Sequence, residues 1–188
     1  MRTSVTLLRY DHGLIHQVTD VMIEVIMHRS ADKHLADLKE IIGFHDKFTD
    51  KFHHHKEEYF LFPVAVEFEG ITYKEMATLI ADHKQLRGQI RSLKKDLVSN
   101  DLESFYRDGY AFVDTIQRHM RHEEDNFFPS IEDKMSLDID SQLYERFEKF
   151  MASDFDPDLY NITEGFANRI QDEVLGSGYY ERKSSQFS

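Results

Sequence analysis

The chain has 188 residues, enough for one domain with a hydrophobic core, and it carries a formal net charge of -12. It contains no cysteine, which excludes disulfides, thiolate metal sites, iron–sulfur clusters and cysteine nucleophiles. The sequence has neither a basic face suited to nucleic acid nor an apolar run of the roughly 20 residues that span a membrane. We therefore expect a cytoplasmic protein that binds neither nucleic acid nor membrane.

The first part of the chain predicts four long amphipathic helices. Pro63 and Pro129 predict the ends of the second and fourth helices, because proline lacks the N–H that a helix interior needs. Thr72 and Asp101 stand at N-cap positions before the third and fourth helices. Short connections favour antiparallel neighbours, so the sequence predicts an all-α fold, an antiparallel up-down-up-down four-helix bundle. Apolar residues recur at alternating spacings of three and four over residues 5–28, 31–62, 73–98 and 101–128.

The predicted bundle occupies residues 1–135, and residues 136–188 form a C-terminal extension. Within the extension, residues 139–152 and 158–175 are compatible with two shorter helices, followed by a polar tail. We expect the extension to pack on the bundle or to contribute to an oligomer. No residue pattern in it indicates chemistry, and the oligomeric state stays open.

A histidine interrupts the apolar stripe of each of the four predicted helices, and on two of the helices a glutamate follows one turn later. A single buried histidine is more often a satisfied core residue than a ligand, but here every stripe carries one. A buried glutamate is costly unless it is paired, and no lysine or arginine on the opposing stripes stands at the same level. A divalent cation would solve this burial problem, so the pattern predicts a metal site. Its candidate ligands are His12, His53, Glu57, His83, His119 and Glu123.

These residues form one motif that is written twice. The order His…His-x-x-x-Glu occurs from residue 12 to 57 and again from residue 83 to 123. Two facing units of this kind have pseudo-twofold symmetry, and two metals, each with two terminal histidines and bridged by both glutamates, use the set evenly. Imidazole and carboxylate ligands without thiolate suit iron, manganese or zinc. Since histidine binds metal only when neutral, affinity is expected to fall as the pH drops through about 6.

The second helix allows two registers for its motif. His53 with Glu57 and His54 with Glu58 both have the i, i+4 spacing that places two side chains on one helix face. On an ideal helix His54 points about 100° away from His53. The second copy of the motif favours the first register, because Met120 stands where a second histidine would be.

Other polar residues near the predicted site have more than one interpretation. His16 lies one turn beyond His12 and is either an additional metal ligand or a polar residue that supports the ligands. His45 lies two turns before His53, where a buried, hydrogen-bonded role is favoured over ligation. Glu58 and Glu124, next to the proposed bridging glutamates, are interpreted as solvated or helix-pairing charges.

Four segments of the chain resemble the hemerythrin-like, or HHE cation-binding, family, in its microbial branch. They are YDHGLIHQV, FHHHKEEYFLFP, DHKQLRGQI and QRHMRHEEDNFFP, each similar to the family's segment for one helix, and the resemblance as a whole covers about residues 5–135. The resemblance implies a four-helix bundle with two non-haem iron ions, favoured over manganese or zinc, and a bridging oxo or hydroxo group. It implies that the six candidate ligands named above bind iron and that the two glutamates bridge.

Departures from the family pattern bear on function. Arg87 stands where the oxygen-carrier branch has a second histidine on its third helix, and Glu123 where that branch has an aspartate one residue further along. Dedicated oxygen transport is therefore disfavoured. The resemblance implies a protein that binds O2 or NO for sensing, storage or protection. The alternative is an enzyme in which the same centre turns over peroxide, NO or Fe(II), and both roles need the same ligands.

Overall fold

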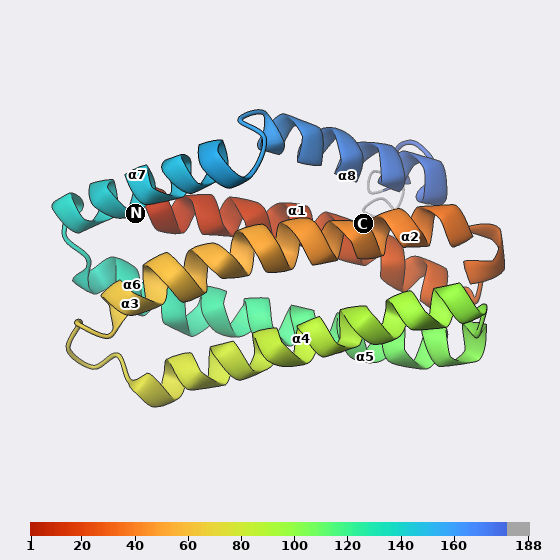
Figure 1. The fold of residues 1–188 in the computed structure, drawn as a ribbon, viewed down its shortest axis with the longest axis horizontal. Coiled ribbons are helices and arrows are strands. Elements are labelled where there is room, and N and C mark those ends of the chain that lie inside the picture. Colours follow the sequence, from red (N-terminus) through yellow and green to blue (C-terminus); the bar gives the residue numbers. More distant parts are fainter. Residues whose placement is uncertain (180–188) are drawn as a thin grey trace, which may run out of the picture.

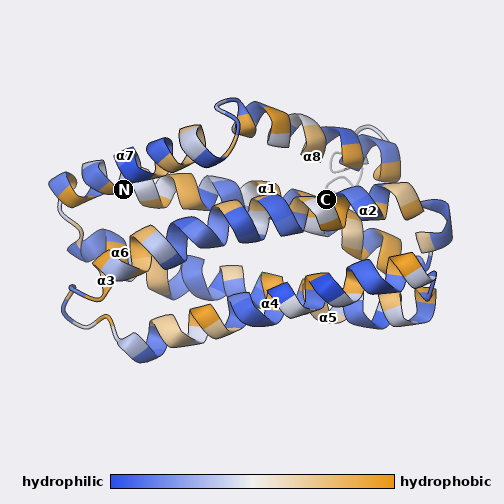
Figure 2. Cartoon of the chain, viewed as in Figure 1, coloured by the Kyte–Doolittle hydropathy of each residue, from blue (hydrophilic) through white to orange (hydrophobic). Residues whose placement is uncertain are grey.

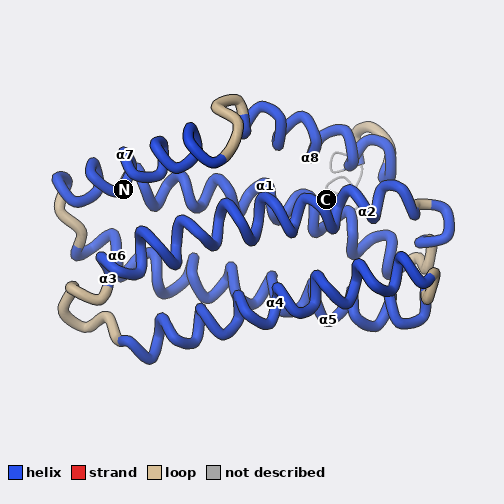
Figure 3. The backbone as a smooth tube through the Cα atoms, in the orientation of Figure 1, coloured by secondary structure: helices blue, strands red, loops and turns tan. Residues whose placement is uncertain are grey.

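The computed structural model describes residues 1–179, and these residues form helices and loops without any strand (Figure 3). The predicted all-α class is confirmed. Four long helical segments lie along the long axis of the molecule, and consecutive segments run in opposite directions (Figure 1). They are α1 (Thr3–Met27); α2 (Leu35–Phe44) with η2 (His45–His54), η3 (Glu57–Leu61) and α3 (Phe62–Ala65); α4 (Tyr73–Ser99); and α5 (Leu102–His122) with η4 (Glu123–Phe127) and α6 (Phe128–Lys134). A short 3₁₀ turn, η1 (Ala31–Lys33), joins the first two segments.

The predicted helix starts are confirmed by their capping hydrogen bonds. Thr72 Oγ1 accepts the backbone N–H of Glu75 at 3.1 Å, and Asp101 Oδ1 accepts that of Ser104 at 3.1 Å. Each bond satisfies one N–H that the first helical turn leaves without an intrahelical partner. These caps determine where α4 and α5 begin, and thus the level at which their inward side chains meet.

The prediction that Pro63 and Pro129 end their helices is wrong. Pro63 lies inside α3, which continues to Ala65, and Pro129 lies inside α6, which continues to Lys134. A π-helical turn, η3 or η4, ends two residues before each proline. In a π turn the hydrogen bonds run from i to i+5, so the bonding pattern shifts and each proline stands in the first turn of a new α-helical segment. There the missing N–H is not needed.

Two apolar clusters fill the core, and a polar layer separates them. Along α1, Leu8 belongs to the smaller cluster and Ile15 to the larger one, with the buried His12 between them. The same order holds on α4 around His83. Figure 2 shows apolar and polar residues alternating along each long helix, as amphipathic helices require. The polar layer therefore lies at one level of the bundle, between two clusters, and Phe60 packs against both of them.

Two further helices, α7 (Leu137–Asp154) and α8 (Leu159–Leu175), lie along α1 (Figure 1). Their ranges match the two helices predicted in the extension, and the remainder of the predicted tail from residue 180 lies outside the described residues. Asp140 of α7 accepts the backbone N–H groups of Thr3 and Ser4 at 2.8 and 2.9 Å, which caps the start of α1. Phe147 joins the smaller apolar cluster and Ile170 the larger one, so both helices share the core. No helix within residues 1–179 combines the length and apolarity needed to cross a membrane.

Candidate metal centre

The six candidate ligands come together in the polar layer, and each is at most 1% exposed. They form two groups whose ligand atoms lie within 4.8 Å of one another, and the two glutamates belong to both groups. The first group contains His12, His53, Glu57 and Glu123, and the second contains His83, His119 and the same two glutamates.

In the first group the two imidazoles face each other. His12 Nε2 and His53 Nε2 are 3.1 Å apart. His12 Nε2 lies 3.3 Å from Glu123 Oε2, and His53 Nε2 lies 3.4 Å from Glu57 Oε1. All four side chains thus direct nitrogen or oxygen atoms toward one small volume.

The second group repeats this geometry. His83 Nε2 and His119 Nε2 are 3.1 Å apart. His83 Nε2 lies 3.4 Å from Glu57 Oε2, and His119 Nε2 lies 3.2 Å from Glu123 Oε2. Each glutamate is therefore near a histidine of each group, an arrangement that follows the pseudo-twofold symmetry of the sequence.

The donor set fits two metal ions. Neither oxygen of Glu57 or of Glu123 has a hydrogen-bond partner, although both side chains are fully buried. A buried carboxylate in this state is strongly unfavourable unless a cation balances it. The 3.1 Å between paired Nε2 atoms also agrees with two imidazole nitrogens that each lie about 2.1 Å from one ion at right angles.

The outer nitrogen of each of the four histidines faces a carboxylate. Such a contact holds the proton on Nδ1 and leaves the Nε2 lone pair directed into the core, as ligation requires. Three of the contacts are hydrogen bonds, and the fourth is longer. The pairs are His12–Glu124 at 2.9 Å, His53–Asp11 at 3.0 Å, His83–Glu58 at 2.7 Å and His119–Asp82 at 3.7 Å.

These outer carboxylates correct the interpretation of Glu58 and Glu124 as solvated charges. They follow the two inward glutamates directly, and Asp11 and Asp82 directly precede the first histidine of each copy of the motif. The repeated unit is therefore longer than the predicted motif: it reads Asp-His followed by His-x-x-x-Glu-Glu. The repeated Asp-His and Glu-Glu pairs were the signal that could have identified them.

The charges in this layer depend on whether an ion is bound. Burial lowers the pKa of His12, but the nearby carboxylates of Glu123 and Glu124 outweigh this effect and raise that pKa to about 9. The pKa of His83 is likewise raised to about 9 by Glu57 and Glu58, against the effect of burial. Without metal, one imidazole of each pair, His12 or His83, is thus protonated on both nitrogens and positively charged at neutral pH. Protons then compete with metal below about pH 9, well above the threshold expected from ordinary histidines.

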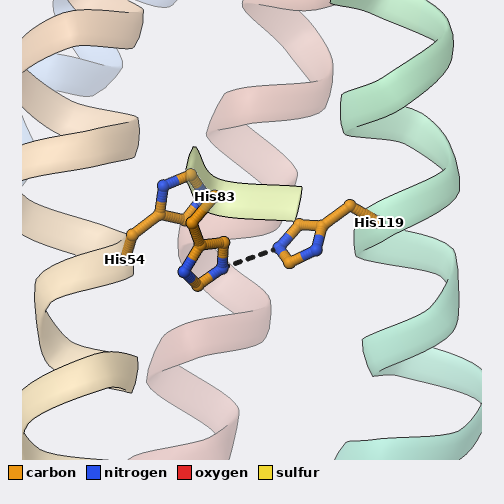
Figure 4. Close-up of side chains that lie close together, drawn as sticks. All are labelled: His54, His83 and His119. Carbon is orange, nitrogen blue, oxygen red and sulfur yellow. Dashed lines mark hydrogen bonds between the residues drawn. The ribbon is translucent and has the colours of Figure 1, made fainter. Parts of the chain in front are cut away.

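The histidines of both alternative registers in the second helical segment, His53 and His54, point into the core. His53 belongs to the first group, while His54 stacks on His83 with ring centroids 3.8 Å apart and planes at 13°. Figure 4 shows His54, His83 and His119 converging from three helical segments, with the hydrogen bond between the last two dashed. The π-helix η2 accounts for this, because each residue of a π-helix turns less about the axis and consecutive side chains can share a face. His54 is thus a fifth imidazole beside the second group, and its pKa is kept well below the ordinary value by burial and the neighbouring histidines.

His16 and His45 lie outside both groups. His16 is exposed and lines a surface pocket of about 320 Å³ with Glu124, the carboxylate behind His12. It occupies the place that Arg87 holds in the other copy of the motif, where Arg87 donates to Glu58 at 2.7 Å. The predicted hydrogen-bonded role of His45 is confirmed, since it is buried with Nδ1 3.1 Å from the hydroxyl of Thr49.

Comparison with known proteins gives one match. The model of a family described as the hemerythrin HHE cation binding domain matches residues 3–131. No curated protein and no solved structure matches the chain. The matched range contains both groups and all four outer carboxylates, and it ends before α7 and α8.

Proposed function

Because the chain belongs to the hemerythrin HHE cation-binding family, we propose that its polar layer holds two non-haem iron ions and binds O2 or NO for sensing, storage or protection. One observation carries the proposal: two groups of histidine and glutamate share two buried carboxylates that have no hydrogen-bond partner. The preference for iron over manganese or zinc, and the bridging oxo or hydroxo group, rest on the family. We also infer that residues 1–135 form the antiparallel up-down-up-down four-helix bundle of this family and that residues 136–188 are an extension packed on it.

In this proposal each side chain has a defined role. His12 and His53 would bind the first ion, His83 and His119 the second, and Glu57 and Glu123 would bridge them. Bound iron would supply an open coordination position and electrons for a diatomic ligand.

Phenylalanine rings cover one histidine of each group. His12 stacks on Phe128 with ring centroids 5.4 Å apart, and His83 stacks on Phe62 at 6.1 Å. Both phenylalanines are at most 3% exposed. These rings exclude bulk water from the layer, which supports binding of a small apolar gas.

Metal content tests the proposal directly. Purified protein is expected to contain two iron atoms per chain, and the reduced protein is expected to give a reversible absorption change with O2 or NO. A His53→Ala variant should lose about half of the metal. His45→Ala is the matched control, since it removes a buried histidine of the same helix that lies outside both groups. Protein without metal, or with a single zinc ion, would contradict the proposal.

Steady-state decay of added peroxide separates the binding role from the enzymatic one. A binding protein should consume peroxide only in stoichiometric amounts. Rapid turnover that disappears in Glu123→Ala would instead favour a di-iron enzyme acting on peroxide, NO or Fe(II).

The outer carboxylates predict a graded effect on metal affinity. Glu58→Gln removes the negative charge behind His83 and should weaken metal binding by about 10- to 100-fold, because such partners orient the ligand and raise its basicity. Titration against a chromophoric chelator measures this change. Asp46→Asn is the control, because Asp46 is also a partly buried ion-pair partner but contacts lysines instead of the histidines. Equal affinities in the two variants would argue against the role of Glu58.

A further inference from the structure

The C-terminal helix α8 reaches the hydrogen-bond network behind the candidate metal centre. The hydroxyl of Tyr160, the second residue of α8, donates to Asp11 Oδ1 at 2.9 Å. Lys56 Nζ donates to the Tyr160 hydroxyl at 3.1 Å and also to Asp11 Oδ2. The three side chains therefore form a closed ring of hydrogen bonds, and Asp11 in turn accepts the Nδ1–H of His53 at 3.0 Å.

The two charged members of this ring are fully buried and balance each other, while Tyr160 is half-buried. Asp11 and Lys56 are each 0% exposed, and their charges oppose each other. The ammonium group of Lys56 also lies 4.1 Å from the centroid of the Phe52 ring, a favourable cation–π distance. Asp11 thus receives three donors, one each from His53, Lys56 and Tyr160. A lost donor leaves an unsatisfied acceptor in the core, which costs more than the same loss at the surface.

Asp11 differs from the other three outer carboxylates in its burial. The side chains of Glu58, Asp82 and Glu124 are 15%, 18% and 36% exposed, so water can reach them. Asp11 is closed to solvent, and its position depends on protein donors alone. The first group of ligands therefore depends on a neighbour outside the range matched by the family model. Within residues 1–179 no tyrosine hydroxyl donates to Glu58 or Asp82, the outer carboxylates of the second group.

We propose that Tyr160 is a positioning residue for the first metal group, acting through Asp11 on the orientation and proton position of His53. The inference rests on the proposed function, because it assigns a role toward the ion that His12 and His53 would bind. In this proposal the C-terminal extension contributes a side chain, Tyr160, that helps to orient a metal ligand. Tyr160 itself is held by its ring, which packs edge-on against Tyr10 at 5.5 Å and Phe52 at 5.8 Å.

Metal titration of Tyr160→Phe tests this role. The variant keeps the aromatic ring and its packing and removes only the hydroxyl. When zinc is titrated in competition with a chromophoric chelator, the affinity for one of the two zinc ions should fall by about 3- to 10-fold. This is less than the roughly 10- to 100-fold loss typical of a direct hydrogen-bond partner of a ligand. The other equivalent should keep its affinity. Loaded with Co(II), the variant should show changed absorption bands for one equivalent only.

Tyr106→Phe is the matched control. Tyr106 is a buried tyrosine, 9% exposed, and its hydroxyl accepts the backbone N–H of Ala31 at 3.0 Å, outside the polar layer. This variant likewise loses a tyrosine hydroxyl that makes a hydrogen bond, here a more deeply buried one, and it should bind both metal ions as the unmodified protein does.

Three outcomes would overturn the inference: unchanged affinities in Tyr160→Phe, equal weakening of both equivalents, or the same change in the Tyr106→Phe control. Failure of the proposed function looks different, because the unmodified protein would then bind no pair of metal ions. NMR of the metal-free protein adds a second readout, in which the Nδ1–H resonance of His53 should shift in Tyr160→Phe while that of His83 stays in place. An unshifted His53 resonance would also count against the inference.

Discussion

Glu123→Ala is expected to weaken the binding of both metal ions, each by more than about 100-fold, since loss of an outer partner alone costs about 10- to 100-fold. The reason is that Glu123 Oε2 lies within 3.3 Å of one histidine of each group. His12→Ala should weaken only one ion, because His12 belongs to the first group alone. Chelator competition with zinc, followed by elemental analysis, measures both equivalents in each variant.

The pseudo-twofold symmetry of the layer supplies the control for this experiment. Glu57→Ala should reproduce the result of Glu123→Ala, since Glu57 also contacts both groups through its two oxygens. Glu124→Gln should act on one ion, because Glu124 contacts only His12 among the ligands. Loss of a single equivalent in Glu123→Ala would contradict the shared, bridging role.

Metal removal is expected to reverse the pH dependence of stability between pH 6.5 and 9. In the metal-free protein the pKa values of His12 and His83 are raised from 6.5 to about 9, so the folded state holds more protons than the unfolded state in this range. Their contribution to stability is complete below pH 6.5 and is lost as the pH rises through about 9. In the loaded protein protons compete with the metal, so stability should rise with pH over the same range.

Thermal unfolding followed by circular dichroism measures this difference. The Tm of protein in excess chelator should fall from pH 6.5 to 9, while the Tm with saturating metal should rise or stay level. Metal added to unbuffered metal-free protein near pH 7.5 should release about two protons per chain, one from each pair. The comparison is limited to pH values above 6.5. Burial lowers the pKa of His45 to about 3, so the unfolded state takes up a proton on His45 before the folded state does, and both forms lose stability as the pH falls below 6.5. A metal-free Tm that rises toward pH 9 would refute the protonation scheme.

Spacing in the sequence predicted the helices and the level of the site because both depend on local periodicity. Side chains three and four residues apart must share a helix face, so the inward direction of His12, His83 and Glu123 followed from position alone. The capping residues Thr72 and Asp101 were predictable for the same reason, since a cap bonds to the N–H three residues on.

The features that escaped prediction depend on tertiary packing. An α turn and a π turn differ by one residue in their hydrogen bonding, and the sequence of η2 does not distinguish them. As a result the two registers were treated as alternatives although both His53 and His54 point inward, and the continuation of helix past Pro63 was missed. Tyr160 lies 149 residues from Asp11 in the chain, and no periodic pattern links two residues so far apart.

The polar layer also lies between two apolar clusters, one packed at each end of the bundle. The apolar cluster around Leu8 and the one around Ile15 each hold one end of every long helix, and the layer between them contributes little apolar contact. In metal-free protein we expect the two ends to unfold less cooperatively, coupled through side chains such as Phe60 that pack against both clusters, since cooperative unfolding follows contiguous packing. Ions bound in the layer would tie all four helical segments together at its centre, so that the two ends unfold as one unit.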